Sequence, residues 1–253
     1  MLKDYLEEIY GAYHRRDLVG SDPLLFLYDY GTLADREVVG LIASGLAYGR
    51  VAQIQKSITR VLAPLGPHPA LFLQENAREL SGLYADFKHR FTTGEQIGDL
   101  LRRTAQVLCR YGGIEAFLGE CLRRRRSLFE ALDEFARVLC PPKPAFPLLT
   151  APGDGSACKR LLLYLRWMVR SDEVDPGGWK ALSPRDLVVP TDTHMHRMAR
   201  LLSLTARRQA DLRTAMEITG AFARLCPDDP VRYDFSLTRL GILRETEALD
   251  SFL

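Results

Sequence analysis

Apolar residues recur along most of this chain at the three- and four-residue spacing of amphipathic helices. One such face, near the start, comprises Leu2, Tyr5, Leu6, Ile9 and Tyr13. Asp22-Pro23 then marks a break. No stretch shows the alternation of apolar and polar residues that is typical of a half-buried strand. The pattern therefore predicts an all-α fold.

Helical spacing resumes at Val38 and continues to Leu62, but Gly45 and Gly49 interrupt it. Each glycine costs a helix up to about 1 kcal/mol relative to alanine. We therefore expect two helices that flank a break at Ser44–Arg50.

Capping signals mark two further helices. Thr93 with Gln96, and Ser127 with Glu130, have the spacing of capping boxes before apolar runs. Gly112-Gly113 is expected to end the first of these helices.

The second half of the chain begins with a proline-rich stretch. Pro141–Gly155 holds five prolines and predicts a loop or a crossing between lobes. A helix is expected over about 156–170. Ser183-Pro184 and Asp229-Pro230 each resemble an N-cap followed by a first-turn proline, the latter before a helix over 231–241.

Composition allows a sizeable core, in one large domain or two lobes, because 47% of the 253 residues are hydrophobic. The net charge is only +2, and the basic residues are mostly arginine, which alone does not indicate nucleic-acid binding. The five cysteines are scattered and odd in number, so a disulfide framework is not expected and a reducing cytoplasm fits best. Neither a signal peptide nor a membrane span is expected.

The segment Val188–Arg200 carries the most informative chemistry. It places Asp192 where an apolar, extended stretch turns into a helix. As an N-cap, this carboxylate would meet free N–H groups and the positive end of the helix dipole, which favour its ionised form. The pattern predicts a fixed anion, either as a structural cap or as a catalytic group.

The motif in this segment, V-P-x-D-T-H-x-x-R-x-A-R, resembles the V-D-T-H-x-x-R-x-x-x-R segment of the helix-hairpin-helix DNA glycosylase superfamily, which includes endonuclease III. Over Asp22–Gly241 the chain is more similar still to the DUF2400 family, particularly around residues 41–51, 156–170 and 188–200.

The superfamily resemblance implies a two-lobed all-α fold, with a helical barrel lobe over 35–187 and a second lobe formed by 1–34 plus 188–253. It also implies that Asp192 is catalytic in a base-excision glycosylase acting on an extruded base of duplex DNA that carries a damaged or modified base. The alternative is a binding protein for DNA or a nucleotide on the same fold, without bond cleavage. Oligomeric state stays open.

An accompanying abasic-site lyase activity would need an amine that forms a Schiff base. If Pro152-Gly153-Asp154-Gly155 aligns with the superfamily's phosphate-binding P-G-V-G hairpin, the lysine position falls on Ala157. The archaeal 8-oxoguanine glycosylases suggest a second alignment, with a degenerate hairpin, under which Lys159 is the catalytic amine. Both alignments remain open.

The same resemblance implies a set of DNA contacts. In the break, Leu46 is a candidate wedge, Tyr48 a candidate stacking platform and Arg50 a phosphate contact. The remaining expected DNA contacts are Gly153, Gly155, Ser156, Arg160 and Arg197.

No cofactor is expected. His194 and His196 are two residues apart and would not face each other on a helix, so we expect no metal site. Endonuclease III carries four closely spaced C-terminal cysteines that hold an iron-sulfur cluster. Here only Cys226 follows Asp192, and no cluster is expected.

Overall fold

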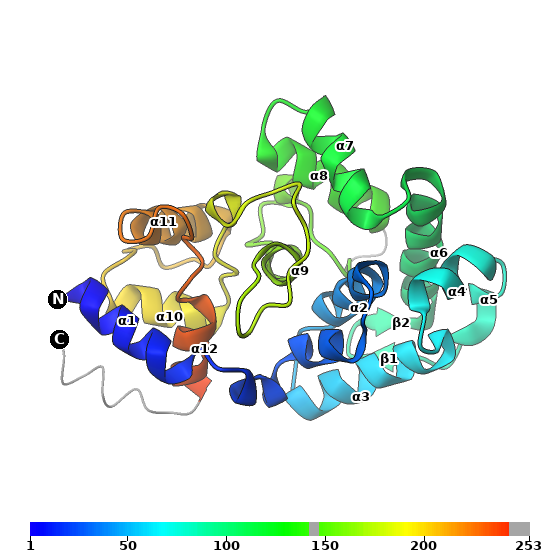
Figure 1. Ribbon diagram of the computed structural model, residues 1–253, viewed down its shortest axis with the longest axis horizontal. Helices are drawn as coiled ribbons and strands as arrows, with labels where there is room; N and C mark the ends of the chain where they lie inside the picture. Colours follow the sequence, from blue (N-terminus) through cyan, green and yellow to red (C-terminus); the bar gives the residue numbers. More distant parts are fainter. Residues whose placement is uncertain (142–146, 243–253) are drawn as a thin grey trace.

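The computed structural model describes residues 1–141 and 147–242, and this part of the chain is mostly helical (Figure 1). The α-helices are α1 (Leu2–Tyr13), α2 (Leu33–Gly45), α3 (Val51–Leu62), α4 (Pro69–Glu75), α5 (Leu80–Leu83), α6 (Gly94–Tyr111), α7 (Ile114–Arg124), α8 (Leu128–Leu139), α9 (Lys159–Val169), α10 (Thr193–Leu201), α11 (Leu212–Ala223) and α12 (Asp234–Ile242). The 3₁₀ helices are η1 (Arg16–Ser21), η2 (Pro23–Asp29), η3 (Ala63–Leu65), η4 (Pro152–Asp154) and η5 (Pro184–Asp186). The prediction of an all-α fold is confirmed.

The predicted break between two helices is also confirmed, since α2 ends at Gly45 and α3 begins at Val51. The capping box of Thr93 and Gln96 opens α6, and Gly112 ends it in the left-handed conformation. Ser127 caps α8 by accepting a hydrogen bond from the amide of Glu130.

Three boundaries differ from the prediction. Helix α9 starts at Lys159 rather than near Ser156, because Cys158 adopts a left-handed backbone with φ of 49°. Ser183-Pro184 opens only the single turn η5, and α12 begins at Asp234, a few residues after Asp229-Pro230. In the predicted loop over Pro141–Gly155, residues 142–146 lie outside the described residues.

A small antiparallel hairpin was not predicted. Strand β1 (Lys88–His89) pairs with β2 (Thr92–Thr93), with Lys88 opposite Thr93 and His89 opposite Thr92. Two residues per strand are too few to produce a recognisable alternation in the sequence.

Helices from the two ends of the described chain lie together. Helix α1 packs on α12, which also packs on α10. In Figure 1 these helices and α11 form one group on the left, α2 to α8 form another on the right, and α9 lies between the groups. Helix α9 packs on α2, and its residues are buried from Leu161 to Val169. The proposed lobe boundaries stay a prediction, and 243–253 lie outside the described residues.

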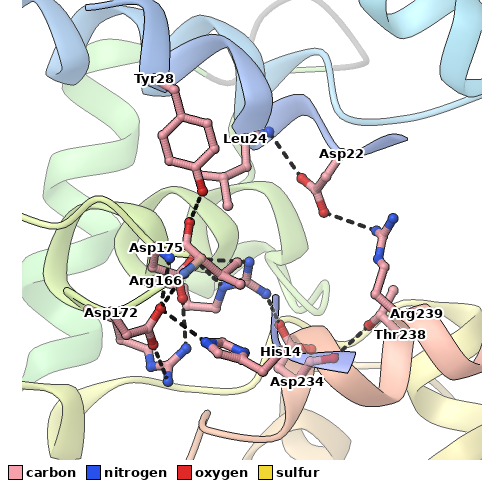
Figure 2. A network of polar contacts seen from close by, with 12 residues as sticks. His14, Asp22, Leu24, Tyr28, Arg166, Asp172, Asp175, Asp234, Thr238 and Arg239 are labelled. Carbon is pink, nitrogen blue, oxygen red and sulfur yellow. Dashed lines mark hydrogen bonds and ion pairs between the residues drawn. The ribbon is translucent and has the colours of Figure 1, made fainter. Parts of the chain in front are cut away.

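A buried network of ion pairs joins α9 to the terminal helices (Figure 2). Arg166 on α9 pairs with Asp234 on α12 and lies 3.2 Å from Asp175. Arg170, one turn later, also pairs with Asp175 at 2.7 Å. All four side chains are almost fully buried. Because a buried charge is costly unless it is paired, these contacts fix α12 against α9.

The network extends to the first helix and the start of η2. Asp172 lies 2.7 Å from Arg170 and 3.0 Å from the Nε2 of His14 on α1. Arg239 on α12 pairs with Asp22 at 3.1 Å, and Asp22 also caps η2 (Figure 2).

Candidate functional site

Asp192 occupies the predicted N-cap position of α10. The stretch before it is buried and extended, and Asp192 itself keeps an extended backbone with φ of −107°. Its Oδ1 accepts a hydrogen bond from the amide of Met195 at 2.8 Å. The cap therefore orients the carboxylate and uses one of its two oxygens.

The other oxygen meets Lys159. The Lys159 Nζ lies 2.9 Å from Asp192 Oδ2, so the structure brings the two predicted catalytic residues together. Lys159 is the first residue of α9 and Asp192 directly precedes α10, so both stand at helix N-termini. The side chains keep 33% and 20% of their surface exposed, which leaves the pair open to a ligand.

The surroundings keep Asp192 ionised. Burial raises the pKa of this carboxyl, but the Lys159 charge and hydrogen bond and the Met195 amide outweigh burial. The net pKa lies below the ordinary value. Asp192 is thus an anion at neutral pH, as its sequence context predicted.

A cleft of about 820 Å³ opens over this pair. Its walls come from seven parts of the chain: the start of η2, the break between α2 and α3 with the start of α3, the β1–β2 turn, residues 150–166, the start of α10, Ala210, and α12. Among the predicted site residues, the cleft is lined by Tyr48, Ser156, Lys159, Arg160 and Asp192.

Within the break, the three predicted DNA contacts have different surroundings. Leu46 has no exposed surface, so it cannot act as a wedge in this conformation. Tyr48 is half-buried, and its hydroxyl lies 2.8 Å from the carbonyl oxygen of His89, to which it donates, and 2.6 Å from Thr92 Oγ1. Arg50 is exposed and does not line the cleft.

Arg160 is more enclosed than a phosphate contact on a free surface. Its guanidinium donates to the carbonyl oxygens of Pro147 at 2.8 Å and Gly45 at 3.3 Å, and it lies 5.2 Å from the Tyr48 ring centroid. Burial lowers its pKa. These contacts tie α9 to the end of α2, which is a structural role that the sequence did not indicate.

The predicted phosphate-binding hairpin, residues 152–155, contacts a carboxylate and carries another one. The amide of Gly153 donates to Asp133 Oδ1 at 2.8 Å, and Asp154 pairs with Arg137 at 2.8 Å. A phosphate at this amide would displace Asp133 and meet two negative charges. Neither Gly153 nor Gly155 lines the cleft.

Ser156 and Arg197 complete the predicted set. Ser156 lies in the cleft wall, where its Oγ accepts a hydrogen bond from the amide of Cys158 at 3.2 Å. Arg197 is exposed on α10 and lies outside the cleft lining.

Several cleft residues were missed by sequence reasoning. They are Asp22, Arg90, Arg166, Asp234 and Arg239. One of them did leave a signal, since Arg166 is the single charge in the buried stretch Leu161–Val169. The others come from distant parts of the chain that only the fold brings together.

Residues 1–141 and 147–242 contain neither a metal-binding cluster nor a membrane-spanning helix. No group of three or more histidine, cysteine, aspartate or glutamate side chains there could hold a metal ion. Likewise, no described helix has the length and apolar character needed to cross a membrane.

Comparison with known proteins assigns a family. A family model described as "Protein of unknown function (DUF2400)" matches residues 22–243. Searches of curated proteins and of solved structures gave no match. The family match covers most of the chain, including both residues of the ion pair and all of the cleft lining except Ser21. The chain therefore belongs to the DUF2400 family.

Proposed function

We propose that this protein is a DNA base-excision glycosylase-like enzyme that acts on an extruded base of duplex DNA. The observation that carries the proposal is the ion pair of Lys159 and Asp192 in the cleft. The resemblance of the segment around Asp192 to helix-hairpin-helix glycosylases and the all-α fold of the described residues support it.

The chemistry of the pair fits this reaction. Breaking an N-glycosidic bond builds positive charge on the sugar, and a fixed carboxylate stabilises that charge. Asp192 is such a carboxylate, because its cap and its ion pair hold it ionised. This anion would face C1′ of the extruded nucleotide.

Lys159 supplies the nucleophile for a lyase reaction. The Lys159 ammonium would first pass one proton, through the Asp192 carboxylate, to the base. The resulting neutral amine would attack C1′ as the glycosidic bond breaks, and the protonated base would leave with the bonding electrons. Loss of the amine's proton and ring opening then give a Schiff base, from which the strand can be cleaved. The 2.9 Å contact with Asp192 holds Nζ beside the carboxylate that stabilises the sugar.

Local energetics also single out this position. A cation is unfavourable at a helix N-terminus, yet Lys159 is the first residue of α9. It follows Cys158, a non-glycine residue in the left-handed conformation. Such backbone costs about 1–3 kcal/mol and is concentrated at functional sites.

The test measures base release from duplexes that carry oxidised, deaminated or alkylated bases, and strand cleavage of duplexes that carry abasic sites. Asp192→Asn keeps a capping side chain, so the fold should survive while release falls by at least roughly a hundredfold. Lys159→Gln should abolish borohydride trapping of the protein on DNA.

Matched controls exist in the chain. Asp211 also caps a helix, α11, and pairs with Arg207, so Asp211→Asn tests the loss of a capping carboxylate elsewhere. Lys180 is exposed and outside the cleft, so Lys180→Gln should leave trapping intact. Base release that survives in Asp192→Asn would show that Asp192 is only a cap.

A non-catalytic DNA or nucleotide binder is the second candidate. The observation that favours it is that both oxygens of Asp192 already have partners within the protein, as in a purely structural cap. Tight binding to every duplex in the panel without release of any base would support this alternative.

A further inference from the structure

The break between α2 and α3 is covered rather than presented to a ligand. Leu46 is fully buried, and the Tyr48 hydroxyl is bound to the β1–β2 hairpin. The Arg90 side chain lies across Gly49, since a Cβ added there would be 3.0 Å from Arg90 Cδ. The hairpin turn therefore covers the break and takes its place on the surface where the sequence predicted DNA contacts.

The turn presents one large apolar side chain. Arg90 and Phe91 connect the paired residues His89 and Thr92, which have no exposed surface. Phe91 keeps 61% of its surface exposed, the largest fraction among the internal large apolar side chains that the structure describes as exposed. An aromatic side chain that is exposed at the tip of a turn has a ring face available for stacking on a base.

The base of the turn is firmly held. The two ring nitrogens of His89 lie 2.9 Å from Ser57 Oγ and 2.9 Å from the carbonyl oxygen of Tyr48. The Tyr48 hydroxyl bridges the two strands. A turn fixed in this way loses little conformational freedom when it binds a partner.

Basic residues belong to the turn, to its first strand and to the segment that the turn covers. Arg90 lines the cleft, and its guanidinium lies 5.4 Å from the Phe91 ring centroid. Lys88 on β1 and Arg50 at the start of α3 are exposed as well. An exposed aromatic ring with an arginine beside it, at the edge of a cleft, matches a base stack flanked by phosphates better than it matches an apolar protein surface.

We infer that the Arg90–Phe91 turn is the element that enters the DNA, with Phe91 inserted between base steps beside the extruded nucleotide and Arg90 and Lys88 on neighbouring phosphates. The ring fills the gap that the extruded base leaves, which is the role that the sequence assigned to Leu46. This inference rests on the proposed function in so far as duplex DNA is the ligand.

The test uses a duplex with a tetrahydrofuran abasic analogue opposite 2-aminopurine, whose fluorescence rises when its stacking is lost. The wild-type protein should raise the signal on binding. Phe91→Ala should lose most of this rise and weaken binding about tenfold, whereas Phe91→Leu should retain much of both. Arg90→Gln should reduce the salt dependence of binding by about one phosphate contact.

Leu71→Ala is the matched control, because Leu71 on α4 is 50% exposed and lies outside the cleft lining. A Phe91→Ala protein that unstacks 2-aminopurine as well as wild type would overturn the inference while leaving the glycosylase proposal intact. Unstacking that depends on Phe91, without base release from any lesion, would support the inference and refute the glycosylase. A wild-type protein that binds no DNA, but self-associates through Phe91, would overturn both.

Discussion

At the scale of single residues, two carboxyls that line the cleft have pKa values shifted in opposite directions. Burial raises the pKa of Asp192, but Lys159 and the Met195 amide lower this pKa by more than burial raises it, so the residue stays ionised. Burial also raises the pKa of Asp234, to about 6, and here Arg166 does not compensate. The reason is that Arg166 also pairs with Asp175, so one guanidinium serves two carboxylates.

This difference predicts a pH dependence of stability. An unfolded Asp234 releases its proton near the ordinary pKa of 3.8, whereas the folded protein keeps this proton until about pH 6. Between these values the folded state binds more protons, so Asp234 contributes less stability as the pH rises. Replacing Asp234 with Asn removes this loss. Relative to wild type, the variant's free energy of unfolding should therefore rise by on the order of 1–3 kcal/mol from pH 4 to pH 6.5.

Urea unfolding at several pH values measures this difference directly. Asp99→Asn is the control, because Asp99 is 40% exposed and pairs with Arg102 at the surface of α6. A constant offset between Asp234→Asn and wild type across this range would mean that Arg166 keeps Asp234 ionised.

At the scale of elements, the join between the β1–β2 hairpin and α6 allows no side chain at Gly94. A Cβ at this position would lie 1.5 Å from the carbonyl oxygen of Tyr84. Backbone cannot yield as a flexible side chain can. Gly94→Ala should therefore destabilise the protein by more than about 3 kcal/mol in urea unfolding.

Gly98, one turn further along α6, provides the matched comparison. A Cβ there meets only the carbonyl oxygen of Leu80, at 3.6 Å, which is an ordinary contact. Gly98→Ala should be neutral or stabilising by up to about 1 kcal/mol, because alanine is the better helix former. Equal stability of the two variants would contradict the packing described for Gly94.

Elements with local signals could be predicted from the sequence. The Thr93 capping box, the Ser127 cap and the Asp192 cap depend on residues within one turn, and all three are present. Leu46 shows where such reasoning fails, because its burial depends on side chains distant in sequence. The β1–β2 hairpin is likewise held by contacts with Tyr48 and Ser57 that no local pattern records.

The candidate site divides in the same way. Asp192 could be found because a cap and a motif coincide on it, and Lys159 followed from the resemblance. The 2.9 Å contact between these two residues could not be predicted, since it depends on how the starts of α9 and α10 meet. The position of Asp234 in the cleft could not be predicted either, because it depends on the packing of α12 beside α9.

At the scale of the whole molecule, a net charge of +2 gives little general attraction to DNA. The proposed DNA binding would therefore rely on a few local cations such as those at the hairpin turn. We expect weak binding whose affinity falls roughly ten- to hundredfold between about 50 and 200 mM salt, because each phosphate contact releases counterions. Fluorescence anisotropy with a duplex at several salt concentrations measures the slope. Affinity that does not change with salt would count against DNA as the partner.

The packing of α1 on α12 has a consequence for synthesis on the ribosome. Helix α1 is made before its partner α12, which begins at Asp234, more than 200 residues later. At about 5–20 residues per second, α1 waits roughly 10–45 s with its apolar face uncovered. Nascent chains arrested before α12 should therefore expose α1 to chaperones and proteases, whereas α2 to α8 can already pack among themselves.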